Sequence, residues 1–143
     1  MADAAASNRR PENPRTERPL SPHLQIYRFS VTMFSSIFHR FTGIGLGAGT
    51  LLVAWWVIAA AIGPDAYADF TAVAGHWFGR LVLLGLTVAF IFHLLNGVRH
   101  LFWDAGLGFE KPTARFTGWL VVTLTGLLTV AVWVAAYASM GKL

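Results

Sequence analysis

The chain has 143 residues, of which 55% are hydrophobic and 13% are charged, and its formal net charge is +4. It contains no cysteine, which excludes disulfides, thiolate-ligated iron–sulfur clusters, c-type haem attachment and thiol catalysis within the chain. Residues 41–62, 81–98 and 116–141 form three runs without a charged side chain. About 20 apolar residues cross a bilayer core, so an all-α integral membrane protein with three transmembrane helices is predicted rather than a soluble domain.

The first 30 residues divide into two unlike segments. Residues 1–17 mix small residues, prolines and charges, which is typical of a disordered tail and lacks the apolar core of a secretory signal. Residues 18–30 combine two prolines with histidine, leucine, isoleucine and tyrosine. This composition favours an ordered segment at the inner membrane face or against a soluble partner. The membrane anchor itself is expected over residues 31–141.

The first span is predicted over residues 31–62, with Ser36, His39 and Arg40 near its start. Ser36 and Arg40 are four residues apart and share a helix face. A hydroxyl beside a guanidinium suits a quinone carbonyl, which needs hydrogen bonds that persist as negative charge builds during reduction. His39 and Arg40 suit haem propionates equally well, because arginine pairs with carboxylates. Arg40 alone also suits a lipid phosphate.

Four alternating glycines follow in the first span: Gly43, Gly45, Gly47 and Gly49. They form two pairs with the small-xxx-small spacing that lets helices approach closely in a bilayer. The same spacing leaves room for a cofactor, and the two interpretations are compatible.

The second span is predicted over residues 76–103 and contains His93. At 1.5 Å per residue, His93 lies about 20 Å from Arg80 and about 9 Å from Arg99, in the inner half of the membrane. The charge-free run reaches spanning length if Arg80 and Arg99 snorkel. An ionisable side chain at this depth is costly and usually marks a functional site.

His93, Gly97 and His100 follow the i, i+4, i+7 spacing of one helix face. A glycine one turn from a histidine leaves room for a large flat ligand such as haem. A buried histidine that joins two helices, or one that relays protons, fits the spacing as well. Only His93 is deep among the five histidines, so a second axial haem ligand would have to come from another subunit.

The remaining segments are connections and scaffold. Residues 63–75 are expected to form a short acidic outer loop, and residues 104–112 an inner turn. The third span, over residues 114–139, has tryptophan and tyrosine near its ends, as is common at membrane interfaces. Beyond Arg115 at its start it contains no charged side chain and no histidine, so it is interpreted as scaffold.

The basic residues are distributed unevenly about the spans. Nine lie on the side of the N-terminus and of the second connection: Arg9, Arg10, Arg15, Arg18, Arg28, Arg40, Arg99, Lys111 and Arg115. Two lie on the opposite side: Arg80 and Lys142. This asymmetry predicts a cytoplasmic N-terminus and a periplasmic C-terminus in a bacterial cytoplasmic (inner) membrane, and it favours topology over nucleic-acid binding as the reason for the positive charge.

Three ordered motifs resemble a known family. They are RPLSPHLQIY at 18–27, SIFHRFTG at 36–43, and HLLNGVRH at 93–100 with Asp104. Together they are similar to the large cytochrome b membrane-anchor subunit of succinate dehydrogenase, respiratory complex II. The resemblance covers residues 18–104, while the third span matches only as a hydrophobic helix.

The resemblance implies a complex of four different subunits that reduces ubiquinone with electrons from succinate. A flavoprotein subunit with FAD would oxidise succinate, and an iron–sulfur subunit would pass the electrons to the membrane. This chain would form half of a heterodimeric anchor, sharing one haem b with a second small anchor subunit. The segment at residues 18–27 would meet the iron–sulfur subunit. No succinate-oxidising centre is expected in this chain.

The resemblance also implies roles for individual residues. His93 would be an axial ligand of the haem iron, with the other ligand supplied by the partner anchor. The quinone-binding residues would be Ser36, Ile37 and Arg40. The residues near the haem propionates would be His39, Arg40, Arg99 and His100, although for Arg99 and His100 a structural role is an equal alternative.

Two other functions remain open at this point. One is the anchor of a quinol:fumarate reductase that works in the opposite direction; its dihaem form needs four axial histidines, which one deep histidine disfavours. The other is a small membrane transporter or assembly protein in which His93 and Arg99 handle protons or bind a partner helix.

Overall fold

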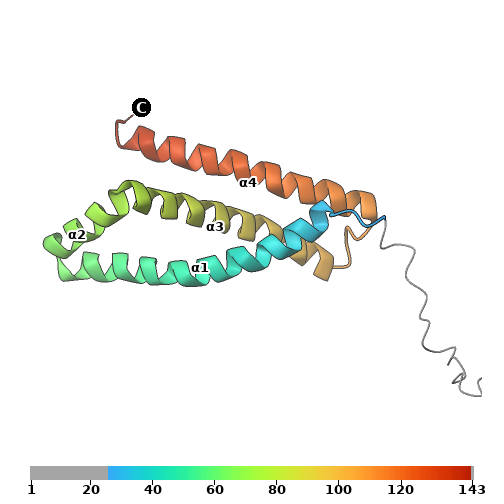
Figure 1. Ribbon diagram of the computed structural model, residues 1–143, viewed down its shortest axis with the longest axis horizontal. Coiled ribbons are helices and arrows are strands. Elements are labelled where there is room, and N and C mark those ends of the chain that lie inside the picture. The colour runs from blue at the N-terminus through green and yellow to red at the C-terminus, as the bar shows by residue number, and fades with distance from the viewer. Residues whose placement is uncertain (1–25, 143) are drawn as a thin grey trace, which may run out of the picture.

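The structure, a computed structural model, describes residues 26–142, which form four helices. In chain order these are α1 (Val31–Ile62), α2 (Pro64–Gly75), α3 (Trp77–Asp104) and α4 (Lys111–Ser139), shown in Figure 1. α1, α3 and α4 are each long and apolar enough to cross a membrane. Within the described residues there is no β-strand. The predicted all-α protein with three transmembrane helices is therefore confirmed.

The three long helices lie side by side in the order α1, α3, α4 (Figure 1). α2 joins α1 to α3 at one end of the molecule. The start of α1, the end of α3 and the start of α4 gather at the other end, which we call the turn end. Because α1 and α3 run antiparallel, residues early in α1 face residues late in α3.

The segment 63–75 is a helix, so the expected loop there is wrong. Gly63 ends α1 with a positive φ of 141°, a conformation that glycine adopts readily. Pro64 then occupies the first turn of α2, where its missing N–H costs nothing, and Asp65 lies at the positive end of the helix. α2 packs on α1 through Phe70, whose ring lies 5.0 Å from that of Trp55. The proline that stops one helix thus starts the next.

The buried positions between the helices are polar as often as apolar. The buried apolar side chains are Ala59, Phe70, Ile91, Phe92 and Val121, and the buried polar ones are Ser35, Thr42, Asn96, Arg99, Thr125 and Thr129. Lipid is as apolar as leucine, so helices in a bilayer associate through close packing and hydrogen bonds rather than through the hydrophobic effect. The polar positions concentrate where α1 meets α3 near the turn end.

Candidate functional site

Three histidine rings lie together at the interface of α1 and α3. The rings of His39 and His93 stack with centroids 3.9 Å apart and planes 10° from parallel. His100 follows, with its ring 5.4 Å from that of His39. The antiparallel pairing of α1 and α3 brings these side chains together from positions more than 50 residues apart, and it unites three of the residues predicted from the sequence.

Thr42 holds the ring of His93 from the side of α1. Its Oγ1 lies 3.1 Å from Nδ1 of His93 and also donates a hydrogen bond of 2.9 Å to the carbonyl oxygen of His39. Thr42 is only 4% exposed, so water does not compete for these bonds. Gly43 also lies against this ring, and a Cβ at that position would be only 3.1 Å from Cε1 of His93. The backbone of α1 can thus approach the imidazole closely.

The histidine cluster retains an unmet polar group and open space. Nδ1 of His39 is buried and has no hydrogen-bond partner within residues 26–142. At Gly97, one turn beyond His93 on α3, no atom outside the adjoining backbone of α3 lies within 4 Å of the place where a Cβ would be. His93 itself is half-buried. The histidine cluster is therefore covered by the helices on one side and is accessible to a ligand on another.

Ser36, Ile37 and Arg40 lie on the exposed surface of α1 close to the histidines. The side chain of Ile37 is 43% exposed. Ser36 and Arg40 are one helical turn apart, so they present a hydroxyl and a guanidinium on the same face. This arrangement offers two hydrogen-bond donors and an apolar contact to a ligand that approaches α1 from outside the bundle.

Arg99 is buried, contrary to the expectation that it snorkels. Its side chain is 5% exposed and donates to Oγ1 of Thr117 (3.0 Å), the carbonyl oxygen of Ala114 (2.7 Å) and Oγ of Ser35 (3.1 Å). The guanidinium also lies 4.1 Å from the ring centre of Trp103. It turns into the bundle because α1 and α4 supply acceptors there, so it joins three helices instead of reaching for the lipid headgroups.

Three buried polar residues of this region did not emerge from the sequence as site residues. They are Ser35, Thr42 and Asn96, and Asn96 accepts a 3.4 Å bond from Arg99 while its Nδ2 is buried without a partner in the described chain. Their spacing in the sequence could have indicated that they share helix faces with the histidines. Ser35, His39 and Thr42 lie on one face of α1, and His93, Asn96 and Arg99 recur every third residue on α3.

The other predicted or possible site residues lie elsewhere. His76 is exposed and accepts a hydrogen bond from the backbone N–H of Phe78 at the start of α3. His23 and most of the predicted contact segment at 18–30 fall outside the described residues. No group of three or more histidine, cysteine or acidic side chains that could hold a metal ion occurs within residues 26–142.

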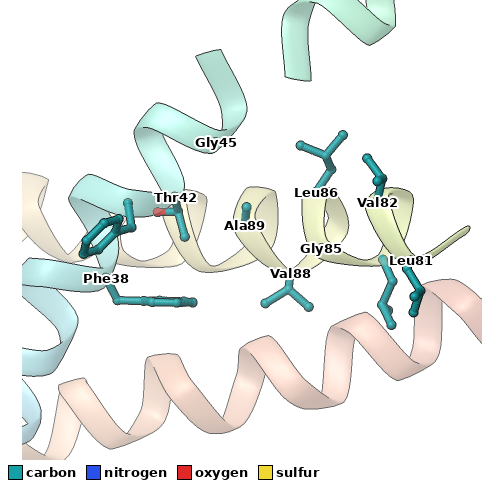
Figure 2. Close-up of a pocket in the computed structure, with 11 residues that line it drawn as sticks. Phe38, Thr42, Gly45, Leu81, Val82, Gly85, Leu86, Val88 and Ala89 are labelled. Atoms are coloured by element: carbon teal, nitrogen blue, oxygen red, sulfur yellow. The ribbon is translucent and has the colours of Figure 1, made fainter. Parts of the chain in front are cut away.

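The apolar groove along α1 and α3 differs from the histidine cluster. It has a volume of about 580 Å³ and is lined by Phe38, Thr42 and Gly45 from α1 and by residues between Leu81 and Ala89 from α3 (Figure 2). Thr42 is the only polar side chain that lines it. The groove offers apolar surface to lipid or to another helix, and its chemistry is limited to the Thr42 hydroxyl.

Known proteins are similar to this chain over most of its length. Residues 14–133 match the family described as succinate dehydrogenase/fumarate reductase transmembrane subunit. The chain is 46% identical to the succinate dehydrogenase cytochrome b556 subunit of Paracoccus denitrificans, over 71% of this chain and 78% of that protein. It is 40% identical to the subunit of the same name from Rickettsia felis, over 82% and 92%. The mitochondrial cytochrome b560 subunit from Homo sapiens is 35% identical over 78% and 68%.

Proposed function

This chain belongs to the family of succinate dehydrogenase and fumarate reductase transmembrane subunits, as a cytochrome b subunit of the succinate dehydrogenase type, and from this premise we propose that it binds haem b through His93 and helps to form a ubiquinone-reduction site. The observation that carries the proposal is the set of contacts that hold the imidazole of His93. A half-buried imidazole in a membrane-spanning helix is held by Thr42 and the stacked ring of His39. Such a costly placement suits an axial ligand.

The residues of the histidine cluster fit a haem. Gly97 lacks a side chain that would crowd a large flat ring next to His93, and Gly43 lets the backbone of α1 lie close to the imidazole. Nδ1 of His39 is a buried donor or acceptor without a partner in the described chain. His39 stacks on His93 and contacts His100, and together with Arg40, next in sequence to His39, these side chains provide nitrogen donors that suit the haem propionates. When bound, the haem supplies a one-electron redox centre next to the quinone site.

Arg99 is the exception in the proposed propionate group. Its guanidinium already donates to Ser35, Ala114 and Thr117 within the bundle. Of the two roles open from the sequence, this geometry favours the structural one. Arg99 then acts on the site by fixing the start of α1, where Ser36 and Arg40 lie.

The proposed quinone site uses the exposed face of α1. Ser36 donates a hydrogen bond that orients one quinone oxygen, and Ile37 provides an apolar contact to the ring. Arg40 places its positive charge where negative charge develops on the oxygens as electrons arrive, which stabilises the reduced substrate. Protons come from the inner aqueous side, which the turn end faces in this proposal.

The proposed complex contains three further subunits. His93 would hold the haem from this chain, and a second small anchor subunit would supply the other ligand and close the haem site. An iron–sulfur subunit brings electrons from a flavoprotein subunit that carries FAD and oxidises succinate. The chain lies in a bacterial inner membrane with its N-terminus in the cytoplasm.

The substitution His93→Leu tests the haem assignment. Leucine is favourable in lipid, so three-span insertion is retained while the b-type haem signal is lost from the reduced-minus-oxidised optical spectrum of the purified complex. His76→Leu is the matched control, because His76 is exposed at the opposite end of α3, and its spectrum should equal that of the wild type. An unaltered haem spectrum and haem content in the His93 variant contradicts the assignment.

A further inference from the structure

The hydroxyl of Thr42 has two partners and one proton. Oγ1 lies 2.9 Å from the carbonyl oxygen of His39 and 3.1 Å from Nδ1 of His93. A carbonyl oxygen can only accept, so the hydroxyl proton is committed to His39. Towards His93, Oγ1 has only lone pairs to offer. The bond between the two side chains is therefore donated by the imidazole, which requires a proton on Nδ1.

The protonation of Nδ1 determines what the other ring nitrogen can do. In a neutral imidazole only one nitrogen carries a proton, and the other has a free lone pair. With Nδ1 as the donor to Thr42, that lone pair is on Nε2. Within residues 26–142, Nε2 of His93 makes no hydrogen bond, while the Nδ1–Cε1 edge of the ring faces Thr42 and Gly43.

The surroundings of Thr42 make this bond persistent. The side chain is 4% exposed, and the hydroxyl is fixed to its own helix through the carbonyl of His39. The ring of His39 lies parallel to that of His93 at 3.9 Å and limits its tilt. The imidazole is thus held in orientation by a hydrogen bond, a stacked ring and a glycine, all from α1.

We propose that Thr42 is the positioning residue for the haem ligand: it fixes His93 in the Nδ1–H tautomer, directs Nε2 to the iron and sets the haem reduction potential. This inference rests on the proposed role of His93. A ligating histidine that donates its second N–H to an oxygen becomes more basic and keeps its orientation. A more basic ligand stabilises the oxidised iron, so the bond to Thr42 lowers the potential.

The test replaces Thr42 by valine and by serine in the intact complex. Thr42→Val keeps the shape of the side chain and removes the acceptor, whereas Thr42→Ser keeps the hydroxyl. The haem-to-protein ratio and the midpoint potential from an optical redox titration are measured for both variants. Thr42→Val is expected to shift the midpoint potential to more positive values and to lower the haem content. Thr42→Ser is expected to restore both towards the wild type.

The outcomes separate this inference from the proposed function. If His93→Leu loses the haem and Thr42→Val leaves the midpoint potential unchanged, the role of Thr42 is wrong while the ligand assignment stands. If His93→Leu retains the haem, both are wrong. Equal potential shifts in the valine and serine variants also overturn the role, because they indicate a packing effect. Thr42→Ala is measured in the same way where the valine variant does not assemble.

Discussion

At the residue scale, Ser36 and Arg40 differ from Ser35 and Thr42 on the same helix because their side chains are exposed, whereas those of Ser35 and Thr42 are buried between helices. Neighbouring residues on one helix thus serve different purposes. Ser35 accepts from Arg99 inside the bundle, and Ser36, next in sequence, points to the surface. A substrate that approaches α1 from outside can therefore reach Ser36 and Arg40 without disturbing the contacts that hold the helices together.

This separation predicts a selective defect in quinone reduction. Ser36→Ala and Arg40→Leu should each lower kcat/KM for ubiquinone about ten- to hundredfold, since a lost hydrogen bond to a developing charge costs about 1.5–3 kcal/mol and 1.4 kcal/mol is a factor of ten. The rate of succinate oxidation with an artificial dye should be unchanged. The measurement compares the two assays on the same purified complex.

The matched controls for this experiment lie at the other end of the molecule. Ser139→Ala and Arg80→Leu change the same residue types at exposed positions of α4 and α3, and they should leave both assays at wild-type rates. Equal losses of quinone and dye activity in the Ser36 and Arg40 variants would indicate faulty assembly and would contradict a role in binding quinone.

His93 and Thr42 differ in how far the sequence alone identifies them. His93 could be singled out because an imidazole deep in a predicted span is unusual whatever surrounds it. Thr42 could not, because a threonine in a membrane helix is ordinary until its neighbour is known. Its contact with His93 depends on the register of α1 against α3, which a single sequence does not specify.

At the scale of the helices, Arg99 connects α3 to both neighbours. It donates to Ser35 on α1 and to Thr117 and the backbone of Ala114 on α4. The planar guanidinium suits this task, because its donors diverge in a fixed fork that one lysine ammonium cannot reproduce. The three helices therefore share one anchoring point at the turn end.

Replacement of Arg99 should loosen that end of the bundle. Arg99→Met removes the bonds to α1 and α4, and the loss is partly offset because a desolvated charge disappears as well. We expect a net destabilisation of about 2 kcal/mol, seen as a lower thermal unfolding temperature of the detergent-purified complex. Arg115→Met, at an exposed position of α4, is the control. An unfolding temperature equal to that of the control would show that Arg99 does not hold the helices.

The number of membrane-spanning helices could be predicted from the sequence because apolar length and glycine–proline stops are local properties. α2 was missed for a related reason: the same Gly63-Pro64 pair that ends α1 also begins the next helix. The burial of Arg99 could not be predicted, because an arginine near the end of a span has the same local sequence whether its side chain snorkels to the headgroups or turns into the bundle. Only the acceptors that α1 and α4 supply decide between them.

At the scale of the whole molecule, the three spans bury little of one another's surface and do not enclose His93. Only 6% of the most apolar window of α1 is buried, and 17% of those of α3 and α4, so most of each helix surface faces outward. His93 remains half-buried in this arrangement. A closed haem site therefore needs surface from outside this chain, which supports the proposed second anchor subunit.

The orientation of the whole molecule gives a final prediction, and the absence of cysteine makes it directly measurable. Ala68→Cys on α2 and Ala105→Cys at the turn end each introduce a single exposed thiol. Within residues 26–142, five of the seven basic residues lie towards the turn end, namely Arg28, Arg40, Arg99, Lys111 and Arg115, and basic residues are retained in the cytoplasm. A membrane-impermeant maleimide added to spheroplasts should therefore label the Ala68 variant and spare the Ala105 variant.

Detergent denaturation should make both thiols reactive, which controls for accessibility. Labelling of Ala105→Cys alone in intact spheroplasts would show the opposite orientation. The proposed quinone site would then lie at the outer face, away from any electron donor in the cytoplasm.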